Sequence, residues 1–294
     1  MQDRVIFHVD ANSAFLSWTA AYRIHVLGET LDLRLVPSVI AGDKASRHGI
    51  ILAKSTPAKK YGIHTGEPLF QALEKCPDLI VAPPDYSLYV EASRHFVKML
   101  RQFSPVVEQY EAWVDMTGTQ RIFGSPRLAA EKMRQRIWDE LGFTVNVGIS
   151  SNKLLAKMAG DFEKPNKVHT LFPEEMERKM WPLPVRDLFL VGSATEKKLK
   201  SLGIYTIGDL AKTDPSILKK RLGKHGETIW HYANGRNAEM VAPEPEENKG
   251  YGNSTTTSED VVTYAHAHQV ILSLCETVAM RMRQDDKCGR CVSI

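Results

Sequence analysis

Asp10 follows the apolar run VIFHV (residues 5–9) and precedes Ala11, Asn12 and Ser13. Valine, isoleucine and phenylalanine favour a buried strand, whereas Asn12 and Ser13 break one. The pattern therefore predicts a strand that presents one carboxylate at its tip. An isolated carboxylate in this place could simply cap the helix that follows. Chemistry with divalent metals would need further acidic groups, brought to the same point by other strands.

Three further segments shift the interpretation away from a simple cap. They are AKSTPAKKYGI (residues 53–63), EAWVDMT (111–117) and VGISSNKLLAK (147–157), the last of which is followed by KPN at 164–166. In this order, and together with Asp10, they resemble a Y-family (translesion) DNA polymerase, most closely the DNA polymerase IV branch. The resemblance covers nearly the whole chain. It implies template-directed DNA synthesis of low fidelity, past damaged template bases, with primer-template DNA and dNTPs as partners.

The resemblance also implies a two-metal site. Polymerases of this kind use two divalent ions, about 3.5–4 Å apart, to hold the attacking 3′-oxygen and the leaving pyrophosphate. Mg²⁺ prefers carboxylate, phosphate and water oxygens, and we expect it here with Mn²⁺ as a possible substitute. By resemblance, Asp10 and Glu111 are the catalytic, metal-binding carboxylates. The backbone carbonyl of Ala11 is a further metal ligand.

The central acidic motif departs from the family pattern. The family reads Ser-Ile-Asp-Glu-Ala, whereas this chain reads Tyr110-Glu111-Ala112, so the Asp before the Glu has no counterpart. Either three residues are deleted, or the protein contains three residues between Tyr110 and Glu111 that this sequence does not include. We favour the second explanation, because losing three residues from a strand exchanges its inward and outward faces. A true deletion favours the alternative function, a polymerase-like DNA-binding protein with impaired or no catalysis.

Four residues are expected to meet the incoming nucleotide. By resemblance, Phe15 is the steric gate, a planar ring that excludes the 2′-hydroxyl of a ribonucleotide; the simpler alternative is a core phenylalanine. Thr56, Lys59 and Lys153 are the candidate triphosphate ligands, since a hydroxyl and two ammonium groups suit phosphate oxygens. The family often has Tyr and Arg at the positions of Thr56 and Lys59, and Lys lacks the bidentate fork of Arg.

A second group of residues is expected to bind DNA. Residues 186–236 carry ten Lys and Arg against five Asp and Glu, as a phosphate-contacting module should. Residues 190–204 resemble a helix-hairpin-helix, and residues 218–226 a degenerate second copy. Glycine there lets backbone N–H groups at a helix N-terminus approach a phosphate. The expected DNA contacts are Gly192, Ser193, Thr195, Lys197, Gly223, Lys224 and Gly226. Glycine-capped helices without any ligand are the alternative.

The apolar patterns predict an α+β fold. Strands are expected near residues 5–9, 36–41, 49–53, 106–116 and 144–149, and helices over residues 89–103 and 128–141, on one face of the sheet. For this order of elements, the resemblance implies a polymerase right hand with a ferredoxin-like palm, small fingers, a helical thumb and a partial little finger. The expected boundaries are 1–14 and 84–168 for the palm, 15–83 for the fingers, 169–238 for the thumb, 239–250 for a linker and 251–294 for the little finger.

In the last of these domains we expect a polar strand at 253–258, a helix over 264–282 and the start of a strand at 291–294. Because two strands and a helix fold only marginally by themselves, this domain looks incomplete. Any contact with a sliding clamp would lie beyond Ile294.

Composition bounds the remaining possibilities. The net charge of +3 is too small to indicate nucleic acid by itself, and no stretch approaches the roughly 18 apolar residues of a membrane span. The chain opens directly on a predicted strand without a leader, and we expect a cytoplasmic monomer. Another two-metal palm enzyme, such as a nucleotidyl cyclase, would share Asp10 but not the basic helix-hairpin-helix.

The four cysteines are too few and too scattered for a disulfide framework. Cys288 and Cys291 have zinc-type spacing, with His266 and His268 upstream. We expect reduced thiols rather than a metal site, since the two histidines of a His-Ala-His helix point to different faces.

Overall fold

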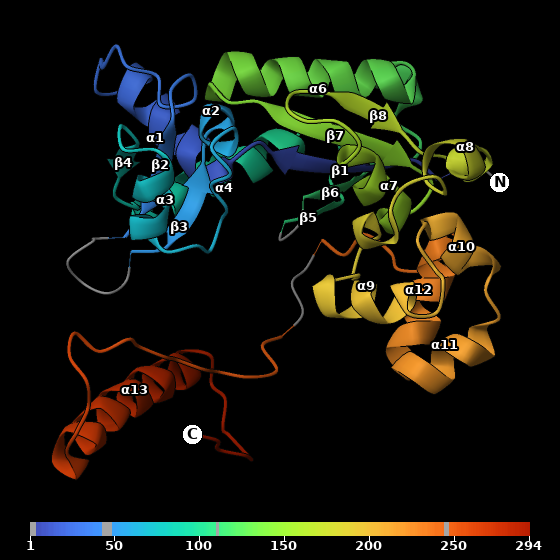
Figure 1. The fold of residues 1–294 in the computed structure, drawn as a ribbon. Coiled ribbons are helices and arrows are strands. Elements are labelled where there is room, and N and C mark those ends of the chain that lie inside the picture. Colours follow the sequence, from blue (N-terminus) through green and yellow to red (C-terminus); the bar gives the residue numbers. More distant parts are fainter. Residues whose placement is uncertain (1–3, 43–48, 110–111, 244–246) are drawn as a thin grey trace. The chain divides into compact units, whose positions relative to one another are not determined.

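The computed structural model describes residues 4–42, 49–109, 112–243 and 247–294. Two compact units emerge from the packing. Residues 1–32 and 85–245 form the first unit, and residues 33–84 and 246–294 form the second. The first unit contains the palm sheet and the thumb helices, and Figure 1 shows both. Each unit is described by itself.

The first unit is built on a five-stranded sheet with the order β5-β6-β1-β7-β8. Its central strand, β1 (Ile6–Ala11), runs antiparallel to β6 (Trp113–Asp115) and to β7 (Val145–Ser150). The edges are β5 (Val107–Glu108), antiparallel to β6, and β8 (Val168–Thr170), parallel to β7. Ile6 lies opposite Ser150 and Asp10 lies opposite Asn146, so this register fixes what stands at each end of β1.

Helices cover both faces of this sheet, although we expected them on one. Helices α4 (Tyr86–Leu100) and α6 (Pro126–Leu141) pack on the main core, to which β1 contributes Phe7 and Val9. Because strand side chains alternate, Ile6, His8 and Asp10 point to the other face. Helix α7 (Lys153–Gly160) covers that face (Figure 1). There Ile6 packs with Ala156.

Helix α1 (Ala14–His25) belongs to the first compact unit, which continues to residue 32, whereas the predicted palm boundary follows residue 14. It packs on α4, where the Thr19 and Tyr89 hydroxyl groups hydrogen-bond at 3.2 Å. The physical reason is that α1 buries an apolar face, including Leu16 and Ala20. The short helix α5 (Gln120–Phe123) leads into α6.

The thumb is a set of short helices that also belongs to the first unit. A 3₁₀ turn (Pro173–Glu175) precedes α8 (Met176–Lys179), and a second one (Val185–Asp187) separates α8 from the remaining helices. These are α9 (Ser193–Lys200), α10 (Ile207–Lys212), α11 (Pro215–Leu222) and α12 (Lys224–Ala233). Leu199, Leu218 and Ile229 are fully buried in one cluster, which includes Leu155 of α7. The thumb is therefore packed directly onto the helix that follows the palm strand β7.

The second unit contains a three-stranded sheet with the order β3-β2-β4. Strand β2 (Ser38–Ala41) is antiparallel to β3 (Ile51–Lys54) and parallel to β4 (Ile80–Ala82), and the helices are α2 (Thr56–Lys59) and α3 (Leu69–Lys75). Helix α13 (Tyr264–Gln284) has no buried residue, and the structure describes all of it. No strand forms within the described residues 247–294, so the strands expected at 253–258 and 291–294 are absent there. No helix among the described residues is long and apolar enough to cross a membrane.

Gly148 lets α7 lie directly on β7. A Cβ atom at this position would stand 1.9 Å from the carbonyl oxygen of Ala156 and 2.4 Å from the amide nitrogen of Gly160. Both neighbours are backbone atoms, so the helix itself would have to move. Gly148→Ala should therefore lower the free energy of unfolding by about 1–3 kcal/mol or more, the usual cost of overpacking.

Denaturant unfolding measures this effect, with Gly250→Ala as the matched control. Among the described residues, no heavy atom lies within 4 Å of a Cβ atom built at Gly250. If both variants unfold like the parent protein, the close contact between α7 and β7 does not exist.

Candidate active site

Asp10 lies at the exposed end of the central strand, next to a lysine that the sequence did not single out. Its carboxylate pairs with the ammonium of Lys164, and the same ammonium lies 2.8 Å from the carboxylate of Asp161. The Asp10 side chain is 38% exposed, so it combines a fixed position with access from solvent. Lys164, and not Lys153, is therefore the lysine at the tip of β1.

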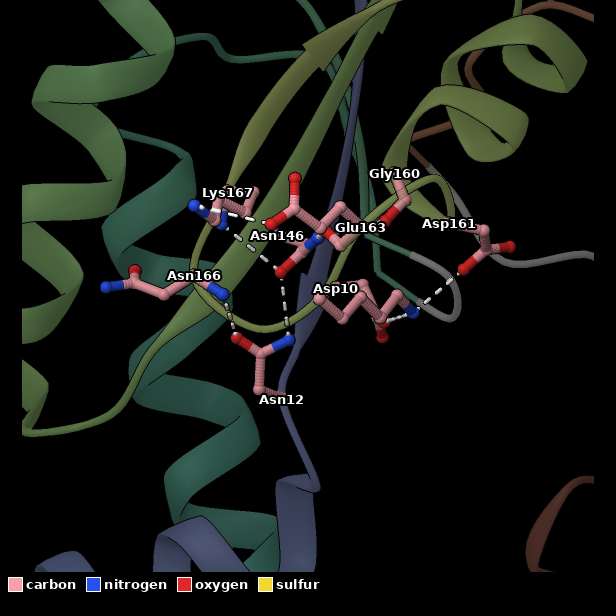
Figure 2. A network of polar contacts seen from close by, with 9 residues as sticks. Asp10, Asn12, Asn146, Gly160, Asp161, Glu163, Asn166 and Lys167 are labelled. Atoms are coloured by element: carbon pink, nitrogen blue, oxygen red, sulfur yellow. Dashed lines mark hydrogen bonds and ion pairs between the residues drawn. The ribbon is translucent and has the colours of Figure 1, made fainter. Parts of the chain in front are cut away.

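A buried amide holds the loop that carries Lys164 (Figure 2). Asn146, opposite Asp10 on β7, is fully buried. Its amide nitrogen donates to the carbonyl oxygens of Gly160 at 3.1 Å and Glu163 at 2.6 Å. Its amide oxygen accepts from the Asn12 side chain at 3.1 Å and from the Lys167 backbone at 3.3 Å. Every hydrogen-bonding position of this amide is thus occupied.

Asn12 completes the loop's attachment to the end of β1. Its side-chain oxygen accepts a hydrogen bond of 3.0 Å from the backbone N–H of Asn166. Residues 160–167 are therefore fixed to the tips of both β1 and β7, and Lys164 lies within this fixed loop. The sequence signal was available, since Asn146 interrupts the apolar strand 145–149, but its significance was missed.

The ionic environment of Lys164 favours its charged form. Burial by itself would lower the pKa of Lys164, but the carboxylates of Asp10 and Asp161 outweigh that effect and raise it above the ordinary value of lysine. Lys164 is therefore protonated at neutral pH and supplies a permanent positive charge beside Asp10.

The backbone of Lys153 lies beyond the Ile6 end of β1. Its ammonium pairs with Glu108, level with His8, so the structure does not bring Lys153 to Asp10. Helix α7 begins at Lys153, shortly after Ser150, and Ser150 lies opposite Ile6. The four residues from Ile6 to Asp10 correspond to about 13 Å of strand. The helix then runs back along the sheet, so that Gly160 and not Lys153 reaches Asn146.

The Lys153 ammonium already has partners. Its nitrogen lies 2.8 Å from both carboxylate oxygens of Glu108 and 4.2 Å from the ring centroid of Trp113. The Lys153 side chain is only 8% exposed. Glu108 also accepts a hydrogen bond of 3.0 Å from the backbone N–H of Ala242. This cluster of Glu108, Lys153 and Trp113 ties residues after the thumb to the palm sheet, where we had expected a free linker.

The metal ligands are described only in part. Asp10 and Ala11 stand at the end of β1, but Glu111 and Tyr110 lie outside the described residues. The adjacent Ala112 accepts a hydrogen bond of 3.0 Å from the backbone N–H of Val9. An exposed carboxylate that already holds a cationic ammonium suits Mg²⁺ by its chemistry. Within the described ranges, however, no group of three or more His, Cys, Asp or Glu residues is placed to hold a metal.

Other carboxylates of the hairpin do not replace the absent Asp of the family motif. Glu108 is bound to Lys153, and Asp115 lies opposite Ile6 and accepts from the backbone N–H of Thr117 at 2.9 Å. Asp115 therefore stands at the Ile6 end of β1. Glu108 lies level with His8, midway along β1, and is already paired with Lys153. On the strand before the break, β5, Val107 is fully buried in the main core.

Phe15 lies in the first turn of α1, five residues after Asp10, and is partly exposed. Its ring stacks on Tyr89. Thr56 and Lys59 both lie on α2 in the second unit and are exposed. Burial lowers the pKa of the neighbouring Lys54, and the positive charge of Lys59 lowers it further, so positive charge gathers at this edge of the fingers.

The structure brings together two helix N-termini in the thumb. Helix α9 begins after Gly192, with Ser193 and Thr195 in its first turn, and α12 begins after Gly223. The Thr195 hydroxyl lies 3.5 Å from Nε2 of His225, which joins the two starts.

The other predicted DNA contacts in the thumb divide into two groups. Lys197 and Lys224 are exposed. Gly226 is buried, and a Cβ atom there would stand 2.4 Å from the carbonyl oxygen of Leu218. Its assignment as a DNA contact is therefore wrong, because it serves the packing of α11 on α12.

The cluster of Glu108, Lys153 and Trp113 yields a stability prediction. Glu108→Ala would leave the Lys153 ammonium buried without its main partner, which typically costs about 3–5 kcal/mol of unfolding free energy. Lys153→Met should cost less, because the Glu108 carboxylate that it leaves is more exposed, at 17%, and still accepts the backbone N–H of Ala242. The exposed pair of Glu91 and Arg94 supplies the control, since Glu91→Ala should change stability by no more than about 1 kcal/mol. Equal costs for Glu108→Ala and Glu91→Ala in denaturant unfolding would contradict the assignment.

Comparison with known families agrees with this architecture. The impB/mucB/samB family matches residues 9–161, and its C-terminal domain matches residues 248–294. The family described as the DNA polymerase-iota thumb domain matches residues 186–237.

Relatives and solved structures point the same way. DNA polymerase IV of Clostridium acetobutylicum is 48% identical over 99% of this chain and 74% of its own length, and DNA polymerase IV of Alkaliphilus oremlandii is 36% identical over 99% and 72%. A Y-family DNA polymerase chimera has a TM-score of 0.78 at 22% identity, over 95% of this chain and 80% of its own. DinB from Sulfolobus solfataricus has a TM-score of 0.69 at 24% identity, over 81% and 69%. These two structures support the right-hand polymerase fold, and the sequence matches show that the chain belongs to the impB/mucB/samB family of Y-family DNA polymerases, together with the DNA polymerase IV proteins.

Proposed function

We propose that this chain is a DNA-directed DNA polymerase of the low-fidelity, translesion type, which extends a primer on damaged template DNA with dNTPs. The 48% identity to a DNA polymerase IV over nearly the whole chain supports the activity. The observation that assigns this activity to particular residues is the pairing of Asp10 and Lys164 at the end of the central strand.

The proposed site residues have different roles in binding the nucleotide and the DNA. Lys164 is a charged ammonium in a fixed loop, which suits the triphosphate of the incoming nucleotide. We therefore assign the triphosphate contact to Lys164 instead of Lys153, because the ammonium of Lys153 is buried against Glu108. Phe15 contributes the ring that meets the sugar. For Thr56 and Lys59, a hydroxyl and an ammonium of the second unit, the proposed triphosphate contact rests on the family resemblance. The starts of α9 and α12, with Lys197 and Lys224, hold the DNA backbone without reading its sequence.

Magnesium would be held by the Asp10 carboxylate, the Ala11 carbonyl and Glu111. When bound, it stabilises charge on the attacking and leaving oxygens of an in-line displacement, and Mn²⁺ is a possible substitute. Because its substrate is DNA, we place the protein in the cytoplasm of a bacterial cell, as a monomer in which one chain carries both the palm and the thumb.

One observation favours a second candidate function. The Asp before Glu111 is absent from the sequence, and neither Glu108 nor Asp115 takes its place in the structure. A chain with this deletion would retain the DNA-binding thumb and lose charge at the metal site, which favours a polymerase-like DNA-binding protein with impaired catalysis.

Primer extension with Mg²⁺ separates these two functions and tests the lysine assignment. We expect extension by the parent protein and none by Asp10→Ala. Lys164→Ala should lower kcat/KM for dNTPs by about 10²-fold, because it removes a charge that meets the triphosphate. Lys153→Met is the matched control and should retain most of the activity.

Two results would contradict the proposal. Absence of extension by a parent protein that still binds duplex DNA would favour the non-catalytic function. If folded Lys153→Met lost more of its kcat/KM for dNTPs than folded Lys164→Ala, Lys153 rather than Lys164 would be the triphosphate ligand.

Phe15 provides a separate prediction about sugar selection. Phe15→Ala should raise the incorporation of ribonucleotides relative to deoxyribonucleotides by about tenfold or more, since a steric clash of a few kcal/mol disappears. Competition between rNTPs and dNTPs at a primer end measures this ratio. An unchanged ratio of ribonucleotide to deoxyribonucleotide incorporation would show that Phe15 is not the steric gate.

A further inference from the structure

We propose that Tyr89 is a positioning residue for sugar selection, which holds the ring of Phe15 in the orientation that excludes ribonucleotides. The inference rests on the proposed role of Phe15 and extends it to a residue on another helix. Tyr89 lies in α4, far from Phe15 in the sequence, yet its ring is the nearest of the aromatic rings described around Phe15.

The two rings stack face to face. Their centroids are 4.3 Å apart and their planes differ by only 5°. The other aromatic neighbours of Phe15 are more distant, with Trp18 at 6.2 Å and Tyr86 at 6.4 Å. Tyr89 is only 3% exposed, whereas Tyr86 is 60% exposed. A buried and therefore immobile ring thus supports one face of a partly exposed ring.

A chain of two hydrogen bonds fixes the same pair of residues through the backbone. The Thr19 hydroxyl donates to the carbonyl oxygen of Phe15 at 2.8 Å, and it also lies 3.2 Å from the Tyr89 hydroxyl. A threonine hydroxyl has only one proton to donate. The Tyr89 hydroxyl must therefore be the donor to Thr19, so that the chain runs from Tyr89 through Thr19 to Phe15.

The start of α1 explains why Phe15 needs this support. Helix α1 begins at Ala14, after Ser13 in the left-handed region with φ of 50°. Within the part of the chain that the structure describes, the Ser13 side chain makes no capping hydrogen bond to the helix. A first turn without such a cap is less firmly held than a capped one. Tyr89 supplies the missing restraint, to the Phe15 ring by stacking and to its backbone through Thr19.

A steric gate works only if its ring cannot move aside. Without Tyr89, the Phe15 ring could adopt another rotamer and leave space for a 2′-hydroxyl. Loss of Tyr89 should therefore affect ribonucleotides much more than deoxyribonucleotides, which do not press on the ring.

The test compares substitutions at Tyr89 with a control on the same helix. Tyr89→Leu removes the ring, and Tyr89→Phe keeps the ring but removes the hydrogen bond to Thr19. Phe96→Leu is the control, because Phe96 is a buried aromatic residue of α4 that packs edge-on against Phe143, with centroids 5.6 Å apart. The readout is kcat/KM for dNTPs and for rNTPs, measured separately, with thermal unfolding to follow stability.

We expect Tyr89→Leu to reduce discrimination against rNTPs by about tenfold, with kcat/KM for dNTPs changed much less. Tyr89→Phe should fall between the parent protein and Tyr89→Leu. Phe96→Leu should lose stability without changing discrimination. A general structural effect would instead lower both kcat/KM values together and would appear equally in Phe96→Leu, which would overturn the proposal.

A second measurement reports on the ring without requiring activity. With 4-fluorophenylalanine at position 15, the ¹⁹F resonance should shift when Tyr89→Leu removes the stacked ring, and should stay in place in Phe96→Leu. Unchanged discrimination and an unchanged resonance in a folded Tyr89→Leu protein would refute the role of Tyr89 while leaving the polymerase function intact. Failure of the parent protein to incorporate dNTPs would instead refute the proposed function, and with it this role of Tyr89.

Discussion

The amide of Asn146 is the interaction on which the candidate site depends. It is buried on the strand beside β1 and binds the backbone of the loop that follows α7. Because an unpaired buried polar group costs about 1–3 kcal/mol, the loop has a strong reason to remain in this position. That position brings Lys164 to Asp10. The charged pair is thus placed by a neutral side chain that takes no part in the proposed chemistry.

The central strand separates two charged clusters with different tasks. Level with His8, midway along the strand, Glu108 and Lys153 are largely buried and join the palm sheet to the segment after the thumb. At the Asp10 end, the carboxylates and Lys164 remain partly exposed and can exchange partners with a ligand. Gly148 makes both arrangements possible, because it allows α7 to run along β7 from one end to the other. Burial therefore distinguishes the structural lysine from the proposed nucleotide ligand.

Sequence reasoning found the elements better than their mutual positions. The apolar runs at 5–9 and 144–149 are strands, and Asp10 stands at a strand end as predicted. Lys153 was predicted as the triphosphate ligand from the segment 147–157, and the KPN segment that follows was quoted without a role for Lys164. The register of β7 on β1 and the direction of α7 show which lysine reaches Asp10. Gly226 misled for a similar reason, since a glycine in a turn pattern serves packing as readily as phosphate binding.

A crystal structure of the protein with primer-template DNA, a non-hydrolysable dNTP analogue and a divalent ion would test the central claim most directly. The account predicts that the triphosphate contacts Lys164, with the metal on Asp10 and the sugar over Phe15, while Lys153 remains bound to Glu108. A triphosphate bound to Lys153, or a nucleotide remote from Asp10, would contradict it.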